Sequence, residues 1–333
     1  MKRDHLYKRH HLSHQQIDDL LDDRGSADFP ELKGQMLAKV HDFIYVSNIL
    51  SEAGIQFIPI KGPMLSYRLY KDPSYRYFSD LDLLMEVQAV KKSIQLLQNE
   101  GYESSYKWPT DKKREEFLID RENQVSLHNP DKNIRIELHW KLIKYNITGK
   151  DIFKNIIRSN QTQISYAGQN FQILNNEFEL LYLTIHGGLH AWQWLKWLVD
   201  VKDFLQNVSL DEDRFIQLTE SLHAGRVIAV CNALLAEHFP GTKLFPQAAG
   251  PSPYLLTYCR KAINDKYDLP RKSIMRILGF TRYRMKCFPG IKYKVSVMKH
   301  LLYSSDQLQN DRVLSNPIVS IATRVGKILL KKK

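Results

Sequence analysis

Cysteine is scarce in this chain, and long apolar runs are missing. The three cysteines among 333 residues are Cys231, Cys259 and Cys287, with no close pair, which argues against a disulfide framework or a zinc knuckle. The most apolar window, residues 178–199, is interrupted by two His, two Gly, a Glu, a Gln and a Lys, so we expect no membrane-spanning helix. Residues 1–16 are charged and lack the apolar segment of a secretory signal. These absences predict a cytoplasmic protein.

Acidic residues become rare only towards the C-terminus. From Cys259 onward there are 18 Lys and Arg against 4 Asp and Glu, which leaves 30 against 32 before it out of totals of 48 and 36. The net charge of +12 therefore belongs to the last quarter of the chain. Residues 271–286 and 316–333 interleave basic residues with Ile, Leu and aromatics. This pattern fits a solvated helix packed on its own domain, an anionic surface on the inner face of a membrane, or a phosphorylated acceptor. We expect no specific DNA binding, because no helix-turn-helix or zinc pattern is present.

Composition and periodicity predict an ordinary globular protein with α+β organisation. Hydrophobic residues make up 43% and charged residues 25% of the chain, enough for a sizeable core. Helical patterns at 36–54, 64–71 and 89–102 alternate with strand patterns at 55–62, 79–87, 124–128 and 133–140, the last two joined by the turn at 129–133. Residues 175–238 and those after 254 are helical in pattern. We predict an N-terminal helical segment at 1–34, a mixed-sheet core with flanking helices at 35–150, a helical domain at 151–258 and a basic helical region at 259–333.

The strongest local feature is a pair of aspartates in a predicted strand. Asp80 and Asp82 are two residues apart, so in a strand they project from one face while Leu81 and Leu83 project from the other. Neighbouring carboxylates repel each other unless a divalent cation, a hydrogen-bond network or a raised pKa compensates. The pair indicates either a metal site or an edge strand with two aspartates in water.

A later strand adds a third acid by the same alternation. Within residues 133–140, Arg135, Glu137 and His139 share one face. If this strand lies beside the Asp80–Asp82 strand, Glu137 completes a carboxylate cluster that suits a hard cation such as Mg²⁺. The alternative is that Glu137 pairs with Arg135 or a Lys on a solvated face.

Two further features have the residue types of binding sites. Lys61-Gly62 joins a predicted strand to a helix whose free N–H groups suit phosphate, and Lys61 and Arg76 could add positive charge there. His186 and His190 are one helical turn apart, which is a metal-ligand spacing. Apolar neighbours favour packing or hydrogen-bonding roles for the two histidines, with a substrate-site role or a zinc hydrolase as alternatives. Between them, Gly187-Gly188 indicates close approach by a backbone or a ligand.

The order of these pieces resembles a known family. The motifs are the Lys61-Gly62 turn, Arg76 with residues 78–84, Gly101-Tyr102, residues 137–140, residues 186–192 and residues 195–200. Over about residues 36–205 they resemble the uncharacterised bacterial nucleotidyltransferases of the DNA polymerase beta-like nucleotidyltransferase superfamily. The resemblance implies a nucleotidyltransferase core that moves a nucleoside monophosphate from a nucleoside triphosphate to an unknown acceptor. We expect the attacking group of the acceptor to be a hydroxyl.

The resemblance also implies roles for individual residues. The catalytic acids that bind Mg²⁺ or Mn²⁺ would be Asp80, Asp82 and Glu137. The residues that contact the nucleotide or substrate would be Lys61, Gly62, Arg76, His139, His186 and His190. The superfamily's usual Gly-Ser after the first strand is replaced here by Gly62-Pro63. That departure removes a hydroxyl contact to phosphate, and the alternative function is an inactive member that binds a nucleotide or a partner.

Overall fold

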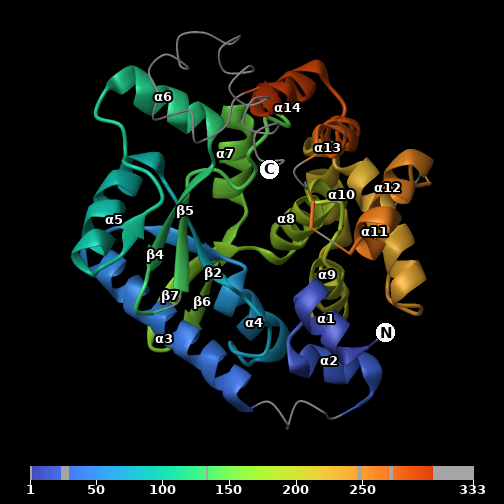
Figure 1. Ribbon diagram of the computed structural model, residues 1–333, viewed down its shortest axis with the longest axis horizontal. Coiled ribbons are helices and arrows are strands. Elements are labelled where there is room, and N and C mark those ends of the chain that lie inside the picture. Colours follow the sequence, from blue (N-terminus) through green and yellow to red (C-terminus); the bar gives the residue numbers. More distant parts are fainter. Residues whose placement is uncertain are drawn as a thin grey trace. The chain divides into compact units, whose positions relative to one another are not determined.

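The computed structural model describes residues 2–23, 30–132, 134–246, 250–266, 268–269 and 273–302 (Figure 1). The chain divides into two compact units, residues 1–144 with 157–175, and residues 145–156 with 176–333. The turn residue Asn133 and the predicted basic helix at 316–333 lie outside the described residues. The four-segment division predicted from the sequence stays a prediction.

The first unit contains a mixed five-stranded sheet. Its strand order is β1-β2-β5-β4-β3, in which β2 and β5 are parallel and the other neighbours are antiparallel. The strands are β1 (Phe57–Ile60), β2 (Asp80–Met85), β3 (Glu103–Ser104), β4 (Gln124–Asn129) and β5 (Ile134–His139). The helices are α1 (Arg3–His10), α2 (His14–Leu21), α3 (Pro30–Glu52), α4 (Gly62–Tyr70), α5 (Val87–Asn99) and α6 (Lys112–Arg121), while α7 (Lys150–Ser159) crosses between the units.

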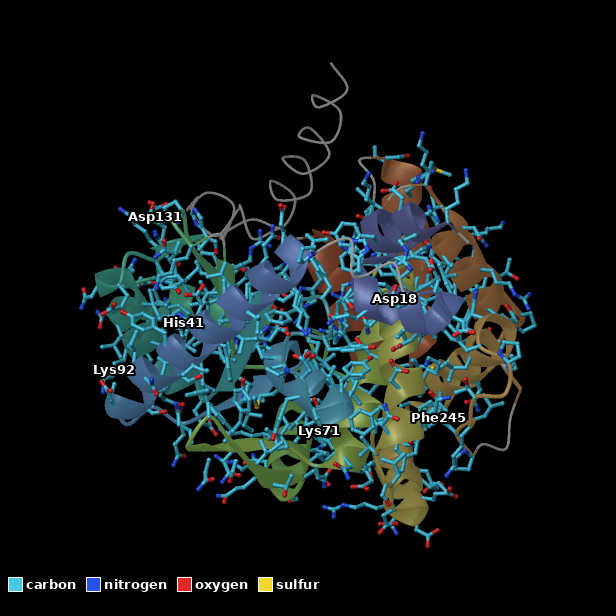
Figure 2. All side chains as sticks on the ribbon, turned by 90° about the horizontal axis from the view of Figure 1, so that it is seen from below. Asp18, His41, Lys71, Lys92, Asp131 and Phe245 are labelled. Atoms are coloured by element: carbon cyan, nitrogen blue, oxygen red, sulfur yellow. The ribbon has the colours of Figure 1, made fainter. Side chains whose placement is uncertain are left out.

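One face of this sheet forms the core of the unit. Alternating residues of β2, β4 and β5 are buried with apolar side chains of α3 and α5, while His41 on α3 and Lys92 on α5 lie on the exposed sides of these helices (Figure 2). The sheet contributes Leu81, Leu83, Val125, Leu127, Ile136 and Leu138 to the core. Because side chains alternate along a strand, the intervening polar residues point to the opposite face.

The four predicted strands of the sheet are confirmed, whereas the short strand β3, the helix α6 and one hairpin were missed. The helix from Pro30 ends at Glu52, just before Gly54, and the four predicted strands correspond to β1, β2, β4 and β5. Residues 161–174, expected in a helical domain, instead form the two-stranded sheet of β6 (Gln161–Tyr166) and β7 (Gln169–Leu174). Ala167 and Gly168 have φ of 50° and 77° in the turn, the conformation that a two-residue hairpin needs.

The second unit is helical in its described residues, apart from connecting turns. It contains α8 (Asn176–Leu189), α9 (Leu195–Asn207), α10 (Glu212–Ser221), α11 (Gly225–His238), α12 (Pro253–Asn264), α13 (Ile274–Cys287) and α14 (Ile291–Leu302). Helix α8 is buried along most of its length and packs against α9, α10, α11 and α13. The protein therefore has the predicted α+β fold with a C-terminal helical part. Across the described segments, no helix combines the length and apolar character needed to cross a membrane.

Candidate active site

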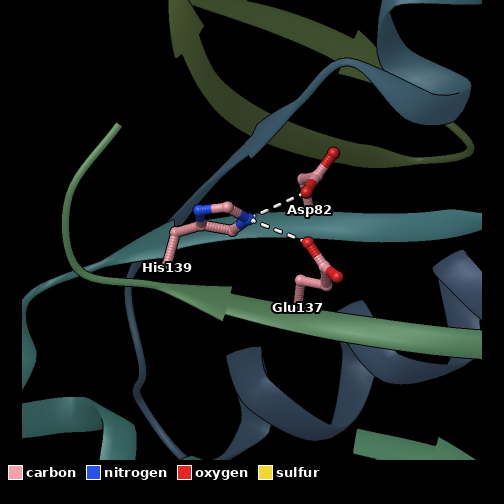
Figure 3. Close-up of side chains that lie close together, drawn as sticks. All are labelled: Asp82, Glu137 and His139. Atoms are coloured by element: carbon pink, nitrogen blue, oxygen red, sulfur yellow. Dashed lines mark hydrogen bonds and ion pairs between the residues drawn. The ribbon is translucent and has the colours of Figure 1, made fainter. Parts of the chain in front are cut away.

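Strand register places two carboxylates side by side on the polar face of the sheet. In the parallel pair of β2 and β5, Asp82 is the partner of Glu137. Leu81 and Leu83 of β2 are buried in the core, so strand alternation holds Asp82 on the other face. Figure 3 shows Asp82 and Glu137 extending from adjacent strands towards the same His139 ring.

His139 joins the two acids into one cluster. Its Nε2 lies 2.8 Å from Asp82 Oδ1 and 3.6 Å from Glu137 Oε2 (Figure 3). One donor atom from each of the three residues falls within 4.8 Å of the others. Asp82 and His139 are 5% and 4% exposed, so both lie almost entirely out of bulk water. Two carboxylates and an imidazole at this separation could hold a metal ion.

Charge interactions shift the pKa values of Asp82 and His139 so that both side chains are charged. Burial raises the pKa of Asp82, but the positive charge of Lys61 and the hydrogen bond from His139 outweigh burial and leave the pKa well below its usual value. Burial lowers the pKa of His139, but hydrogen bonds to Asp82 and Glu137 outweigh it and raise the pKa to about 9. At neutral pH, Asp82 is therefore a carboxylate that faces an imidazolium.

Lys61 reaches the same aspartate from the turn after β1. Its Nζ lies 3.0 Å from Asp82 Oδ2, so the two Asp82 oxygens face Lys61 on one side and His139 on the other. Lys61 has φ 58° and ψ −138° and is followed by Gly62 at φ 50°. A positive φ is costly for lysine, and such strain persists only where surrounding contacts enforce it. Pro63 then lies in the first turn of α4, where its missing N–H costs little.

Polar residues of β4 complete the surroundings of Glu137, and the sequence did not reveal them. Ser126 is the register partner of Glu137 in the antiparallel pair, and its Oγ donates to Glu137 Oε1 at 3.2 Å. Gln124 Nε2 donates to Glu137 Oε2. Asn123, which precedes β4, lies with its Nδ2 3.4 Å from Nδ1 of the neighbouring His139. The alternation of polar and apolar residues in 124–128 indicated that one face of this strand is polar. Only the strand register shows that the polar residues on this face contact Glu137.

Asp80 and Arg76, two of the predicted site residues, are not part of the cluster of Asp82, Glu137 and His139. Asp80 is half-buried and is the register partner of Arg135. Among the described residues, the compact donor group comprises Asp82, Glu137 and His139, and Asp80 is not a member of this group. Arg76 is 2% exposed, and its guanidinium donates to the Tyr77 carbonyl at 3.4 Å. The predicted metal role of Asp80 and the phosphate role of Arg76 stay predictions.

The two histidines of α8 belong to an aromatic cluster in the second unit. The His186 and His190 ring centroids are 4.7 Å apart and lie 5.4 and 5.1 Å from the Trp197 ring. Between them, Gly187 and Gly188 are closely approached by side chains of the second unit, whereas the sequence suggested a backbone or a ligand. A Cβ on Gly187 would lie 2.3 Å from the Trp192 ring, and one on Gly188 would lie 2.2 Å from Val227. The glycines thus have a packing function, while the substrate role of the histidines stays a prediction.

A mixed sheet that pairs an aspartate and a glutamate on adjacent strands beside a Lys-Gly turn corresponds to a nucleotidyltransferase fold. The chain belongs to the family of uncharacterised nucleotidyltransferases, whose family model matches residues 13–240. This confirms the family resemblance inferred from the sequence motifs.

Among solved structures, the chain is similar to one described as the crystal structure of an antigenic nucleotidyltransferase-like protein from Paracoccidioides brasiliensis. The two are 16% identical, with a TM-score of 0.34, and the match covers 64% of this chain and 90% of that one. No curated protein matches the chain.

Proposed function

We propose that the protein is a metal-dependent nucleotidyltransferase that moves a nucleoside monophosphate from a nucleoside triphosphate to an acceptor hydroxyl. The observation that carries this proposal is the register pairing of Asp82 with Glu137, which brings an oxygen of each carboxylate within 4.8 Å of the other. In the reaction, the hydroxyl oxygen bonds to the α-phosphorus, the bond from that phosphorus to the β-phosphate bridging oxygen breaks, and pyrophosphate leaves. The hydroxyl proton passes to solvent. Family membership supports the same chemistry.

The donor set fits Mg²⁺ or Mn²⁺. Asp82 and Glu137 offer the carboxylate oxygens that these hard cations prefer. His139 already donates a hydrogen bond to Asp82 and is best used as the group that orients this carboxylate. When bound, the metal supplies positive charge to the triphosphate and lowers the pKa of the acceptor hydroxyl. In this proposal Asp80, on the same face of β2, adds the third carboxylate.

The surrounding residues hold the acids and the phosphates. Gln124 and Ser126 donate to Glu137 and fix its two oxygens. We assign Lys61 and Arg76 to the phosphates, and Gly62 to the bend that starts α4. Lysine and arginine are the side chains that neutralise phosphate charge by direct hydrogen bonds.

Differently labelled triphosphates test the reaction type. The purified protein is incubated with Mg²⁺ or Mn²⁺, a cell extract as acceptor source, and each nucleoside triphosphate labelled at either the α- or the γ-phosphate. Nucleotidyl transfer places only the α-label on the acceptor and releases the γ-label in pyrophosphate. Transfer of the γ-label would instead identify a phosphotransferase and refute the proposal.

Metal and nucleotide together should raise the melting temperature of the protein. Anything that binds the folded state alone stabilises it, by about 2.7 kcal/mol at a hundredfold excess over Kd. We expect Mn²⁺ with a triphosphate to act in this way and a chelator to reverse the effect, as measured by calorimetry. If zinc alone stabilises the protein, and His186→Gln with His190→Gln abolishes this while Glu137→Gln does not, the alternative zinc hydrolase gains support instead.

The ion pair between Lys61 and Asp82 favours a second candidate, a family member that binds without turnover. Lys61 Nζ lies 3.0 Å from Asp82 Oδ2, so a cation of the protein itself occupies one side of this carboxylate. Together with Gly62-Pro63 in place of Gly-Ser, this arrangement fits a site in which Lys61 replaces a metal ion.

Lys61→Ala separates the two candidates. If Lys61 contacts the triphosphate during catalysis, its loss should raise the KM for the triphosphate by about tenfold or more, since a charged hydrogen bond contributes about 1.5–3 kcal/mol. If Lys61 replaces the metal, its loss should instead tighten binding of Mn²⁺ alone. Isothermal titration with Mn²⁺ and steady-state kinetics measure both. Lys91→Ala, at an exposed lysine of α5, is the matched control and should change neither.

A further inference from the structure

The exposed apolar side chains of the protein are concentrated on α13 and α14. Eleven large hydrophobic residues are exposed in the described part of the chain, and six of them lie on these two helices. They are Ile274, Met275 and Leu278 of α13 and Ile291, Val295 and Met298 of α14. Surface apolar residues are ordinarily scattered, and a concentration of them marks an interaction site.

Helix α14 has an apolar stripe with lysines on both sides. At 3.6 residues per turn, Ile291, Val295 and Met298 fall within about 60° of arc. They are 74%, 46% and 38% exposed. Among its other exposed residues, Lys292 and Lys299 flank the stripe on one side and Lys294 flanks it on the other. This is the pattern of a helix that lies in the plane of a membrane interface.

The opposite side of α14 is anchored in the second unit. Tyr293 and Val297 are buried, and the Tyr293 hydroxyl donates to the Arg284 carbonyl at 2.7 Å. Ser296 Oγ accepts from the Asn146 backbone N–H at 3.2 Å. These contacts fix the rotation of α14 about its axis, so the apolar stripe is held on the outer side of the helix.

The charge around this stripe selects the partner. Residues 273–302 contain seven Lys and Arg and no Asp or Glu, and the three lysines beside the stripe are exposed, which favours an anionic partner. A second copy of the chain would bring the same positive charge against it. A nucleic acid would satisfy the lysines but would leave the apolar stripe in water. An anionic bilayer meets both requirements, because its headgroups attract lysines while its acyl boundary accepts apolar side chains.

We propose that α14, with the neighbouring α13, docks the protein onto an anionic lipid bilayer. Ile291, Val295 and Met298 enter the boundary between headgroups and acyl chains. Lys292, Lys294 and Lys299 extend to the lipid phosphates, their methylene stems lying along the apolar surface. This inference is independent of the proposed nucleotidyl transfer, since no residue of the Asp82 cluster takes part in it.

Vesicle flotation of the full chain tests this proposal. We expect binding to mixed phosphatidylcholine–phosphatidylglycerol vesicles, little binding to phosphatidylcholine alone, and weakening by added salt. Failure of the wild-type protein to bind the mixed vesicles at low salt would overturn the proposal.

A variant without the apolar stripe separates a membrane from other anionic partners. Ile291→Ser with Val295→Ser and Met298→Ser should lower partition to the mixed vesicles by about tenfold or more. The matched control places serine at three exposed apolar positions on other helices, Leu37, Ile152 and Ile216, and should bind as the wild type does. Unchanged binding of the stripe variant would mean a purely electrostatic surface. That outcome would refute insertion of the stripe into the bilayer. Sedimentation of the wild type as a dimer that this variant converts to a monomer would identify a second copy as the partner and would refute the bilayer.

The flanking lysines provide an independent measurement. Replacing Lys292, Lys294 and Lys299 by Gln should weaken partition by a factor on the order of 100, because each lysine near an anionic surface contributes about fivefold. Lys112→Gln with Lys113→Gln, at exposed positions of α6, is the control for loss of charge alone. Equal weakening per lysine in the two variants would show that total charge, and not α14, determines binding. Circular dichroism of every variant checks that the fold is retained.

Discussion

Asp82→Asn is expected to lower metal-dependent nucleotidyl transfer by about 10³-fold or more, equivalent to at least about 4 kcal/mol of transition-state stabilisation. The amide keeps the shape of the side chain but loses the negative charge that faces Lys61 and His139. It therefore weakens metal binding and leaves two cationic groups next to a neutral partner. We also expect the metal-free variant to be less stable than the wild type by about 3–5 kcal/mol, because breaking a buried ion pair leaves its partner charge uncompensated.

The measurements are the rate of α-label transfer, the change in melting temperature with Mn²⁺ and triphosphate, and the thermal unfolding of the metal-free protein. Asp131→Asn is the matched control, at an exposed aspartate in the turn between β4 and β5 (Figure 2), and should retain all three properties. Full metal-dependent stabilisation and transfer in Asp82→Asn would remove Asp82 from the catalytic site.

Asp80→Asn then distinguishes two compositions of the acidic site. The family resemblance assigns Asp80 to the metal, whereas the compact donor group contains His139 together with Asp82 and Glu137. A loss as large as that of Asp82→Asn would show that Asp80 is a metal ligand. A decrease in transfer rate of less than about tenfold would show that Asp82 and Glu137 bind the metal without Asp80. The two outcomes differ by about 3 kcal/mol in transition-state stabilisation.

Alternation along the strands was enough to predict the polar face of the sheet. Leu81 and Leu83 fix the face of Asp82, and Ile136 and Leu138 fix that of Glu137, because each strand has its apolar residues in the core. The sequence could not show that β2 and β5 are neighbours, since they are separated by α5, β3, α6 and β4. Their pairing is a property of the whole sheet, and the contact between Asp82 and Glu137 depends on it.

The role of Lys61 is the clearest case of information that is absent from local sequence. A lysine before a glycine at the start of a helix is typical of a phosphate site, and the pattern predicts no other partner for it. The structure places its Nζ on Asp82, because β1 is antiparallel to β2 and pairs Ile60 with Asp82.

The hairpin of β6 and β7 was missed for a related reason. Its exposed edges are polar, and its buried residues Phe171 and Ile173 belong to the core of the first unit.

Gly188→Ala and Gly187→Ala are expected to destabilise the second unit by about 2–3 kcal/mol each, the usual cost of overpacking a core. The new Cβ would lie 2.2 Å from Val227 Cγ1 at Gly188, and 2.3 Å from the Trp192 ring at Gly187. Trp192 and Val227 are buried, so neither can move aside into solvent. At Gly188 the backbone carbonyl also accepts from the Tyr283 hydroxyl of α13 at 2.6 Å, which ties this turn of α8 to α13 and restricts its movement.

Thermal unfolding should show a decrease in melting temperature of roughly 5–10 °C for either variant. Gly279→Ala is the matched control, because Gly279 lies inside α13 of the same unit and a Cβ there meets nothing within 4 Å. The better helix propensity of alanine should raise the stability of that control by up to about 1 kcal/mol. The change in stability is expected to be negative for the two α8 variants and positive for Gly279→Ala. All three substitutions improve helix propensity alike, but only the α8 glycines are in contact with packed side chains. If Gly188→Ala and Gly187→Ala are as stable as the wild type, the close contacts are not real constraints. The two glycines would then be candidates for the ligand approach that the sequence alone allowed.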